Sequence, residues 1–430
     1  MRTPLVCDSE VHRDSGLIIR MSSPSGFVVD DTLIASLSEL ASGWPGFCWT
    51  LLLFALVGHG GIHIGIYNRV NAFGWPRRRI KLLVKLFFAN TILLPAMLAY
   101  LERASIRSLM DSPTPTLALS AWTTLYLCFC LSSWIWLGIP WLLCRPFIGL
   151  DSVKTNRSIR RFKVQAAFPH ALPLTRKARW ESKLPFNQIL DLSVETVDLP
   201  VHGLPQGLEG YRIAHLSDVH LTGEIHPSYA KFAVQQAHQS RVDMMVITGD
   251  IIDKQSCIDW LPEIFGSVEA PDGCYFILGN HDTRISDSWE TRRAMDLAGW
   301  VDLGSRVIRV PLRGVACDLI GNEFPWFERP TEIANDAAMR LLLSHSPDQF
   351  GWARQHGIEL MLAGHTHGGQ GRLPIAGPIL SPSFHGSRYA SGDFYRPPTT
   401  MHVTRGLGGV HLLRINCRPE LSIINLKTTS

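Results

Sequence analysis

Residues 211–220 read YRIAHLSDVH, an apolar run that ends in Asp218 and His220. Alternate side chains of an extended segment point the same way, so these two residues can bind one ion. Four later segments repeat the pattern of an apolar run before polar residues: 244–250 (MMVITGD), 275–282 (YFILGNHD), 341–345 (LLLSH) and 360–369 (LMLAGHTHGG). Residues 227–240 and 286–298 between them are helix-like. This alternation predicts an α/β layered domain with its site at the carboxyl ends of the strands.

The polar residues at these strand ends favour a metal site. Oxygen and imidazole donors suit Mn²⁺, Fe or Zn²⁺, and cysteine is absent from the set. His365 and His367 have the same spacing as Asp218 and His220. Asp250 is the natural candidate for a bridge between two ions, because a carboxylate has two oxygens. Any one of these motifs would be weak evidence, but five in this order favour one shared centre.

The chain resembles the calcineurin-like metallophosphoesterase superfamily in the order of its motifs: D-x-H, G-D-x-x-D, G-N-H-D, a single His and G-H-T-H. The segments that flank these motifs resemble the bacterial membrane-associated branch of the superfamily. The resemblance covers residues 188–430. It implies a four-layer α/β/β/α sandwich with two divalent ions, of which Mn²⁺ is the first choice and Fe, Zn²⁺ or others are alternatives. The ligands that it implies are Asp218, His220 and His367 for one ion, Asn280, His345 and His365 for the other, and Asp250 as the bridge.

The resemblance also implies a hydrolytic mechanism. A water that bridges the two ions loses a proton and attacks phosphorus in line with the ester oxygen. His281 is not expected to bind metal; oriented by Asp253, it faces the phosphoryl group and stabilises charge there or protonates the leaving alkoxide. Arg405 is a candidate contact for substrate phosphate, with a surface salt bridge as the alternative.

The upstream half of the chain is predicted to lie in a membrane. Three apolar stretches, Phe47–Ile66, Ile80–Tyr100 and Leu117–Leu143, each reach the length of about 20 residues that crosses roughly 30 Å of hydrocarbon. Charged residues make up only 18 % of the 430-residue chain. Met1 and Met21 both remain candidate starts. The predicted organisation is a polar tail over 1–44, a membrane region over 45–144, a basic juxtamembrane linker over 145–187 and a catalytic domain over 188–430.

Basic residues predict the orientation of the spans. The loop between the first two spans contains Arg69, Arg77–Arg79 and Lys81 and no acid, and the segment after the third span is basic as well. Three spans place these two segments on one side of the membrane, and the positive-inside rule makes that side the cytoplasm. We therefore expect a multi-pass protein of the bacterial inner membrane with a cytosolic catalytic domain.

The leading hypothesis is a membrane-anchored phosphodiesterase whose partners are the lipid bilayer and a lipid-linked or small phosphodiester. A UDP-2,3-diacylglucosamine pyrophosphatase of lipid A synthesis is the alternative enzyme. A membrane sensor of phospho-ligands is the alternative without catalysis, but such a protein is expected to have lost a ligand, and none is missing. With 41 Lys and Arg against 37 Asp and Glu, a net charge of +4 argues against nucleic-acid binding. No obligate protein partner is inferred.

Overall fold

The computed structural model describes residues 45–111, 118–145, 148–333 and 336–429. The predicted polar tail over 1–44 and the choice between Met1 and Met21 lie outside these described residues. The chain divides into two compact parts. The smaller one comprises 1–50 and 103–118 and contains the beginning of α2 (Pro45–Val70) and all of α4 (Arg103–Asp111). The larger one comprises 51–102 and 119–430 and contains both large sheets.

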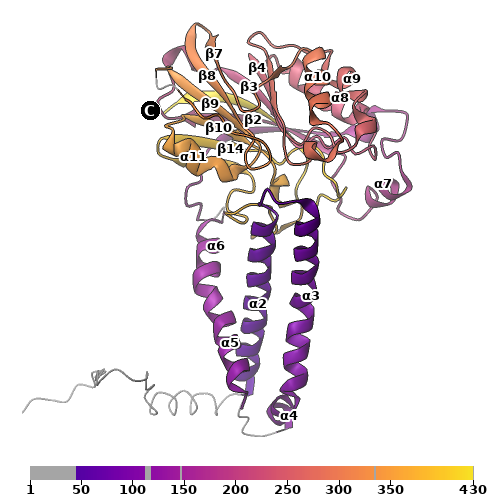
Figure 1. The fold of residues 1–430 in the computed structure, drawn as a ribbon, viewed down its shortest axis with the longest axis vertical. Coiled ribbons are helices and arrows are strands. Elements are labelled where there is room, and N and C mark those ends of the chain that lie inside the picture. The colour runs from indigo at the N-terminus through magenta and orange to yellow at the C-terminus, as the bar shows by residue number, and fades with distance from the viewer. Residues whose placement is uncertain (1–44, 112–117, 146–147, 334–335, 430) are drawn as a thin grey trace, which may run out of the picture. The chain divides into compact units, whose positions relative to one another are not determined.

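Among the described residues, three helical segments are long and apolar enough to cross a membrane: Gly46–Val70, Arg77–Leu101 and Ala121–Leu143. The first lies in α2 and the second is α3 (Arg77–Leu101). The third joins α5 (Ala121–Ser133), a π-helical turn and α6 (Ile139–Leu143). Figure 1 shows these helices as the long indigo and purple ribbons. In length and composition the three helices fit the predicted spans, and that they cross a membrane stays a prediction.

The second half of the chain forms two large mixed sheets. The order of the first is β1-β2-β15-β3-β4-β5-β6, and that of the second is β13-β14-β10-β9-β8-β7. The strands of the first sheet are β1 (Asn156–Lys163), β2 (Asp191–Val201), β15 (Glu420–Thr428), β3 (Arg212–Leu216), β4 (Met244–Thr248), β5 (Cys274–Ile277) and β6 (Val301–Asp302). Those of the second are β13 (Gly392–Arg396), β14 (Thr399–Val403), β10 (Leu360–Ala363), β9 (Met339–Ser344), β8 (Val315–Asn322) and β7 (Val307–Leu312). A short hairpin, β11 (Arg372–Leu373) and β12 (Gly377–Pro378), stands apart from both.

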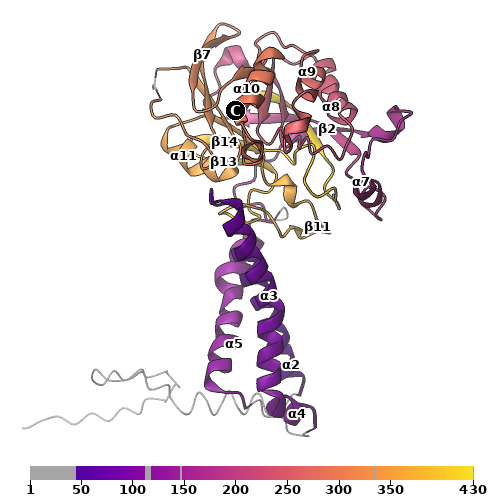
Figure 2. The ribbon, with the colours of Figure 1, turned by 45° about the vertical axis from the view of Figure 1, so that its right-hand side comes forward.

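The two sheets pack face to face and are covered by helices on their outer faces. One apolar core contains side chains of both sheets, such as Val246 of β4 and Leu341 of β9. A second core joins the outer face of the first sheet to α8 (Ser228–Gln239), α9 (Trp260–Phe265) and α10 (Ser288–Leu297). A third joins the other sheet to α11 (Phe350–Gln355). Figures 1 and 2 show α8 and α9 on one side of the sheets and α11 on the other. The predicted four-layer α/β/β/α sandwich is thereby confirmed.

Parts of the predicted linker over 145–187 have regular structure. Asn156–Lys163 form β1, which pairs antiparallel with β2 at the edge of the first sheet, and Arg176–Glu181 form the short helix α7. Most side chains of β1 are exposed, so arginine and lysine are tolerated there and no apolar alternation marks the strand. The structure therefore differs from the predicted linker at these residues. The start of the catalytic domain at residue 188 stays a prediction.

Candidate metal centre

The parallel strands of both sheets bring the predicted ligands to one edge. β3 precedes Asp218 and His220, β4 precedes Asp250, β9 precedes His345, and β3, β4 and β5 run parallel to one another. Five of these side chains stand on left-handed backbone, with φ of 51° at Asp218, 52° at His220, 54° at Asp250, 70° at His365 and 51° at His367. Residues other than glycine rarely adopt such angles, and where they do they cluster at functional sites.

One glycine shows how closely the loops approach. Gly249 precedes Asp250 with φ +87°, and a Cβ there would lie 2.7 Å from the backbone nitrogen of Gly279 and from Nδ1 of His345. Any larger residue would therefore push apart the loops that carry three of the candidate ligands. The glycine at this turn is required by the site geometry.

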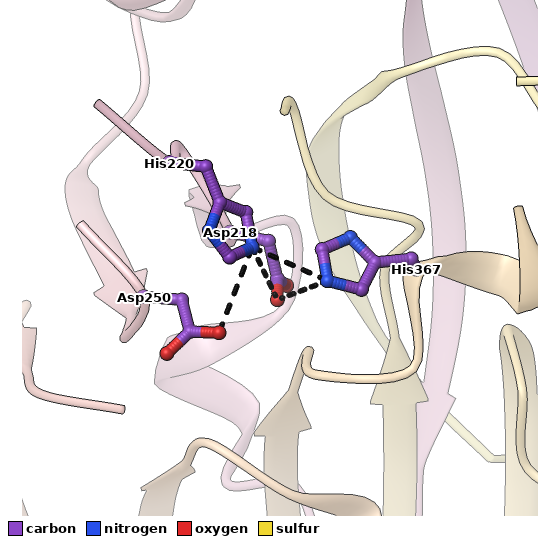
Figure 3. Close-up of side chains that lie close together, drawn as sticks. All are labelled: Asp218, His220, Asp250 and His367. Atoms are coloured by element: carbon purple, nitrogen blue, oxygen red, sulfur yellow. Dashed lines mark hydrogen bonds and ion pairs between the residues drawn. The ribbon is translucent and has the colours of Figure 1, made fainter. Parts of the chain in front are cut away.

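The first cluster contains Asp218, His220, Asp250 and His367, whose ligand atoms all lie within 4.8 Å of one another. The Nε2 atoms of His220 and His367 face each other at 3.2 Å. Nε2 of His220 lies 3.6 Å from Oδ2 of Asp250, and Nε2 of His367 lies 3.5 Å from Oδ1 of Asp218. Figure 3 shows the four side chains pointing toward a common point.

The second cluster contains Asp250, His345 and His365, all of them buried. Nε2 of His345 lies 3.4 Å from Oδ1 of Asp250, 3.0 Å from Oδ1 of Asn280 and 3.1 Å from Nδ1 of His365. Asp250 therefore belongs to both clusters, with one oxygen toward each. This is the arrangement that a bridging carboxylate needs.

Two observations show that these residues fit divalent cations. Oδ1 of Asp218 and Oδ2 of Asp250 are buried without a hydrogen-bond partner, which is costly for a carboxylate unless a cation neutralises it. His345 can donate its Nδ1–H to the carbonyl oxygen of Thr248 at 2.7 Å, which leaves Nε2 free to act as a ligand. The mixed oxygen and imidazole set suits Mn²⁺, Fe or Zn²⁺.

Asp253 lies behind the first cluster and holds three neighbours. Its Oδ2 lies 2.8 Å from Nδ1 of His220, and its Oδ1 lies 2.5 Å from Nδ1 of His281. Arg284 donates to Oδ1 of Asp253 at 2.7 Å and also to Nε2 of His281. These bonds fix the orientation of the His220 imidazole, a candidate ligand, and of the His281 ring, as a carboxylate behind a metal-binding histidine commonly does.

The charges around the centre keep the carboxylates of Asp250 and Asp253 ionised. Burial raises the pKa of Asp250, but the nearby His345 and His281 outweigh that effect and hold the pKa well below its usual value. Burial also raises the pKa of Asp253, and there the charges of His220 and His281 likewise lower it overall. Asp282 has a different environment, because burial and the charge of Asp250 raise its pKa. It accepts backbone N–H groups of Gly279, Ile251 and Ile252, so it supports the loops of the site.

Three nearby side chains were missed by the sequence analysis. Arg284 follows the G-N-H-D motif by two residues, and this spacing is the signal that could have found it. The ring of Trp326 lies 5.3 Å from that of His345 and 4.9 Å from that of His365. Arg414 is buried and donates to the carbonyl oxygens of His367 and Arg405 at 3.0 and 2.8 Å. The last two follow no motif.

Arg405, the predicted phosphate contact, lies outside the two clusters. Its guanidinium is bonded to Glu195 and lies 3.1 Å from Oε2 of Glu420. These contacts are salt bridges, but they are largely buried, whereas the alternative left open by the sequence was a salt bridge at the surface. A contact of Arg405 with substrate stays a prediction.

Comparison with known proteins adds independent support. Residues 211–369 match the calcineurin-like phosphoesterase family. The chain is 31 % identical over 243 residues to the metallophosphoesterase YkuE of Bacillus subtilis strain 168, in an alignment that covers 53 % of this chain and 82 % of that protein. It is 26 % identical over 222 residues to the phosphodiesterase YaeI of Escherichia coli strain K12, covering 50 % and 82 %. It is 25 % identical over 281 residues to the UDP-2,3-diacylglucosamine pyrophosphatase LpxG of Chlamydia muridarum strain MoPn / Nigg, covering 50 % and 84 %.

The matched residues 211–369 include every ligand candidate from Asp218 to His367. YkuE is related over most of its own length, so the likeness extends beyond short motifs to a whole domain. The chain thus belongs to the calcineurin-like metallophosphoesterases, a family of hydrolases that use two metal ions.

Proposed function

We propose that this hydrolase is a membrane-anchored phosphodiesterase that uses two divalent ions, with Mn²⁺ as the first choice. The observation that carries the proposal is the pair of clusters that share Asp250, beside a histidine held by Asp253. We propose Asp218, His220 and His367 as the ligands of one ion and Asn280, His345 and His365 as those of the other. When bound, two such ions activate a water nucleophile and neutralise charge on the phosphoryl oxygens.

The residues beside the clusters would orient the substrate and move a proton. His281 is 11 % exposed at its side chain and does not belong to either Asp250 cluster, so its ring can face a bound ester. Asp253 fixes the ring through Nδ1 and thereby aims Nε2 away from itself. Nε2 of His281 accepts a hydrogen bond from the guanidinium of Arg284. When substrate binds and breaks this hydrogen bond, the guanidinium would neutralise a phosphoryl oxygen. His281 would then stabilise charge or donate a proton to the leaving oxygen.

We propose a phosphodiester that is lipid-linked or small as the substrate. The likeness to the phosphodiesterase YaeI supports the diester, and the three apolar helices support a lipid. A UDP-2,3-diacylglucosamine pyrophosphatase is the second candidate, and the likeness to LpxG favours it. Both candidates require attack of a nucleophile on phosphorus, but they differ in the bond that breaks. A phosphodiester loses an alkoxide from a P–O–C bond, whereas the pyrophosphate loses a phosphate monoester from a P–O–P bond.

A substrate and metal screen with the purified full chain tests this proposal. We expect metal-free protein to be inactive and Mn²⁺ to restore hydrolysis of bis-p-nitrophenyl phosphate in preference to p-nitrophenyl phosphate. Zn²⁺, Mg²⁺ and UDP-2,3-diacylglucosamine belong in the same screen. A strong preference for UDP-2,3-diacylglucosamine would favour the pyrophosphatase. Metal binding without hydrolysis of any ester would favour a sensor of phospho-ligands.

We further propose that the protein spans the bacterial inner membrane three times, with the catalytic domain in the cytoplasm. Arg77–Arg79 at the beginning of α3 and the basic residues of β1 then lie on the same side. A reporter fused after residue 165 should behave as cytoplasmic, and one fused near residue 110 should behave as external, because basic segments are retained inside. Paired phosphatase and fluorescent-protein fusions measure this. External behaviour of the fusion after residue 165 would contradict the proposed orientation.

A further inference from the structure

The turn between α2 and α3 touches the catalytic domain at two places. A Cβ on Gly74 would lie 2.7 Å from the carbonyl oxygen of Pro325, so the two backbones are in close contact. The ring of Phe73 packs edge-on against that of Phe384 at 4.9 Å and stacks on that of Trp75 at 4.5 Å. This turn is the upper end of the two indigo helices in Figure 1.

Both contacted loops belong to the surroundings of the metal centre. Pro325 is followed by Trp326, whose ring lies against His345 and His365. The backbone nitrogen of Phe384 donates to the carboxylate of Asp348 at 3.1 Å, and Asp348 follows His345 by three residues. The turn between two predicted spans is therefore one layer of side chains away from the ligands of the second cluster.

Two polar side chains at the ends of the spans form hydrogen bonds with residues 376–381 of the catalytic domain. Asn68, in the last turn of α2, donates to the carbonyl oxygen of Ile379 at 3.0 Å and accepts from the nitrogen of Ser381 at 2.8 Å. Arg145, two residues after the third span, is 2 % exposed and donates to the carbonyl oxygens of Ala376 and Pro378 at 3.1 and 3.0 Å. Residues 376–381 are thus bonded to the ends of two spans.

Apolar side chains are exposed around this junction. Trp75 is 48 % exposed, Phe324 42 %, Leu380 47 % and Phe384 40 %. We call these four residues the membrane rim. An exposed Trp next to the end of a spanning helix, as Trp75 is to α3, is typical of the interface between water and hydrocarbon. The exposed Arg77–Arg79 follow directly and can attract anionic head groups.

We propose that the membrane rim binds the apolar tail of a lipid from the same bilayer, so that a phosphodiester attached to that tail reaches the metal centre. The inference rests on the proposed phosphodiesterase function and adds the place and direction of substrate entry. A bilayer lipid is the occupant because the rim lies at the ends of the spans, where lipid is the neighbouring phase. Leu380 is part of the segment 376–381 that Asn68 and Arg145 bond, and Phe384 packs on Phe73 in the turn between two spans. The helices then form part of the substrate site as well as an anchor.

The experiment compares two substrates that differ only in the tail. Full-length protein in phosphatidylglycerol vesicles is assayed with ethyl p-nitrophenyl phosphate and with hexadecyl p-nitrophenyl phosphate. The release of p-nitrophenolate gives KM for each ester. Trp75→Ala should raise KM for the hexadecyl ester about tenfold more than KM for the ethyl ester, since it removes one large apolar contact with the tail. Phe384→Ala, on the other side of the junction, should show the same selective loss.

The matched control is Trp180→Ala on α7, where the tryptophan is 67 % exposed and lies outside the rim. This variant should leave both KM values unchanged. An equal rise of KM for the two esters in both rim variants, or no rise in either variant, would overturn the rim as a tail site while the phosphodiesterase function stands. Failure of the unaltered protein to hydrolyse either ester with metal bound would instead overturn the proposed function itself.

Discussion

Replacing Asp250 by asparagine is expected to remove at least one metal ion and to lower turnover by about 10²-fold or more. Asp250 gives one oxygen to each cluster, at 3.6 Å from His220 and 3.4 Å from His345. Asparagine keeps the size of the side chain and tolerates the left-handed backbone, with φ 54°, but carries no charge. Elemental analysis of the full-length variant gives the metal content, and hydrolysis of bis-p-nitrophenyl phosphate gives the rate.

Asp318→Asn is a matched control for this variant. Asp318 is also buried, but it lies on β8 and pairs with Arg309 at 2.8 Å, outside both clusters. Loss of this buried charge should affect stability without changing the metal content of the folded protein. Two ions per chain and an unchanged rate in Asp250→Asn would show that Asp250 is not the bridge.

His281→Asn is expected to leave both metals bound while the rate falls. A positioned general acid contributes about 10²–10⁴-fold, and its contribution grows as the leaving group becomes more basic. An alkoxide needs a proton to leave, whereas p-nitrophenolate does not. The defect should therefore be larger for dialkyl phosphodiesters than for p-nitrophenyl diesters, as measured by kcat/KM on both.

His238→Asn on α8 is the control, because this histidine is exposed and its ring forms a hydrogen bond with the carbonyl oxygen of Glu269, away from both clusters. Equal losses on both classes of diester in His281→Asn would indicate stabilisation of the phosphoryl oxygens in place of proton transfer. Loss of a metal would make His281 a ligand, a reading that its neighbours His220 and Asp253 allow on distance alone.

The layered fold could be predicted because its central strands are buried on both faces. Met244–Thr248 and Leu360–Ala363 are entirely buried, so each is a continuous apolar run. Polar residues directly after such apolar runs are easy to recognise in the sequence. Parallel strands bring these residues together at the carboxyl ends of the strands. Helices α8 and α10 lie within the predicted ranges for the same reason: one face of each is apolar and packs on the sheet.

The parts that could not be predicted depend on contacts distant in sequence. β1 carries Arg160 and Arg161 on an exposed edge strand, where pattern gives no signal. The sequence alone suggests that Arg405 can bind phosphate, but in the folded chain its guanidinium is bonded to Glu195, which is 210 positions away in the sequence. The bonds of Asn68 to residues more than 300 positions later are equally invisible in the sequence. Such contacts become apparent only when the chain is folded.

In the proposed topology, the bonds of Asn68 and Arg145 also determine how the enzyme would encounter its substrate. A catalytic domain on a loose tether would sample a volume around its anchor, at an effective concentration set by the length of the tether. Here the segment 376–381 is bonded to the ends of two apolar helices, so in the proposed topology the domain would keep one height above the bilayer. For any substrate that stays in the bilayer, the relevant quantity is molecules per unit of membrane area. Such an enzyme encounters its substrate by diffusion in two dimensions. Added carrier lipid lowers the surface density of the substrate, just as added solvent lowers the concentration of the substrate of a soluble enzyme.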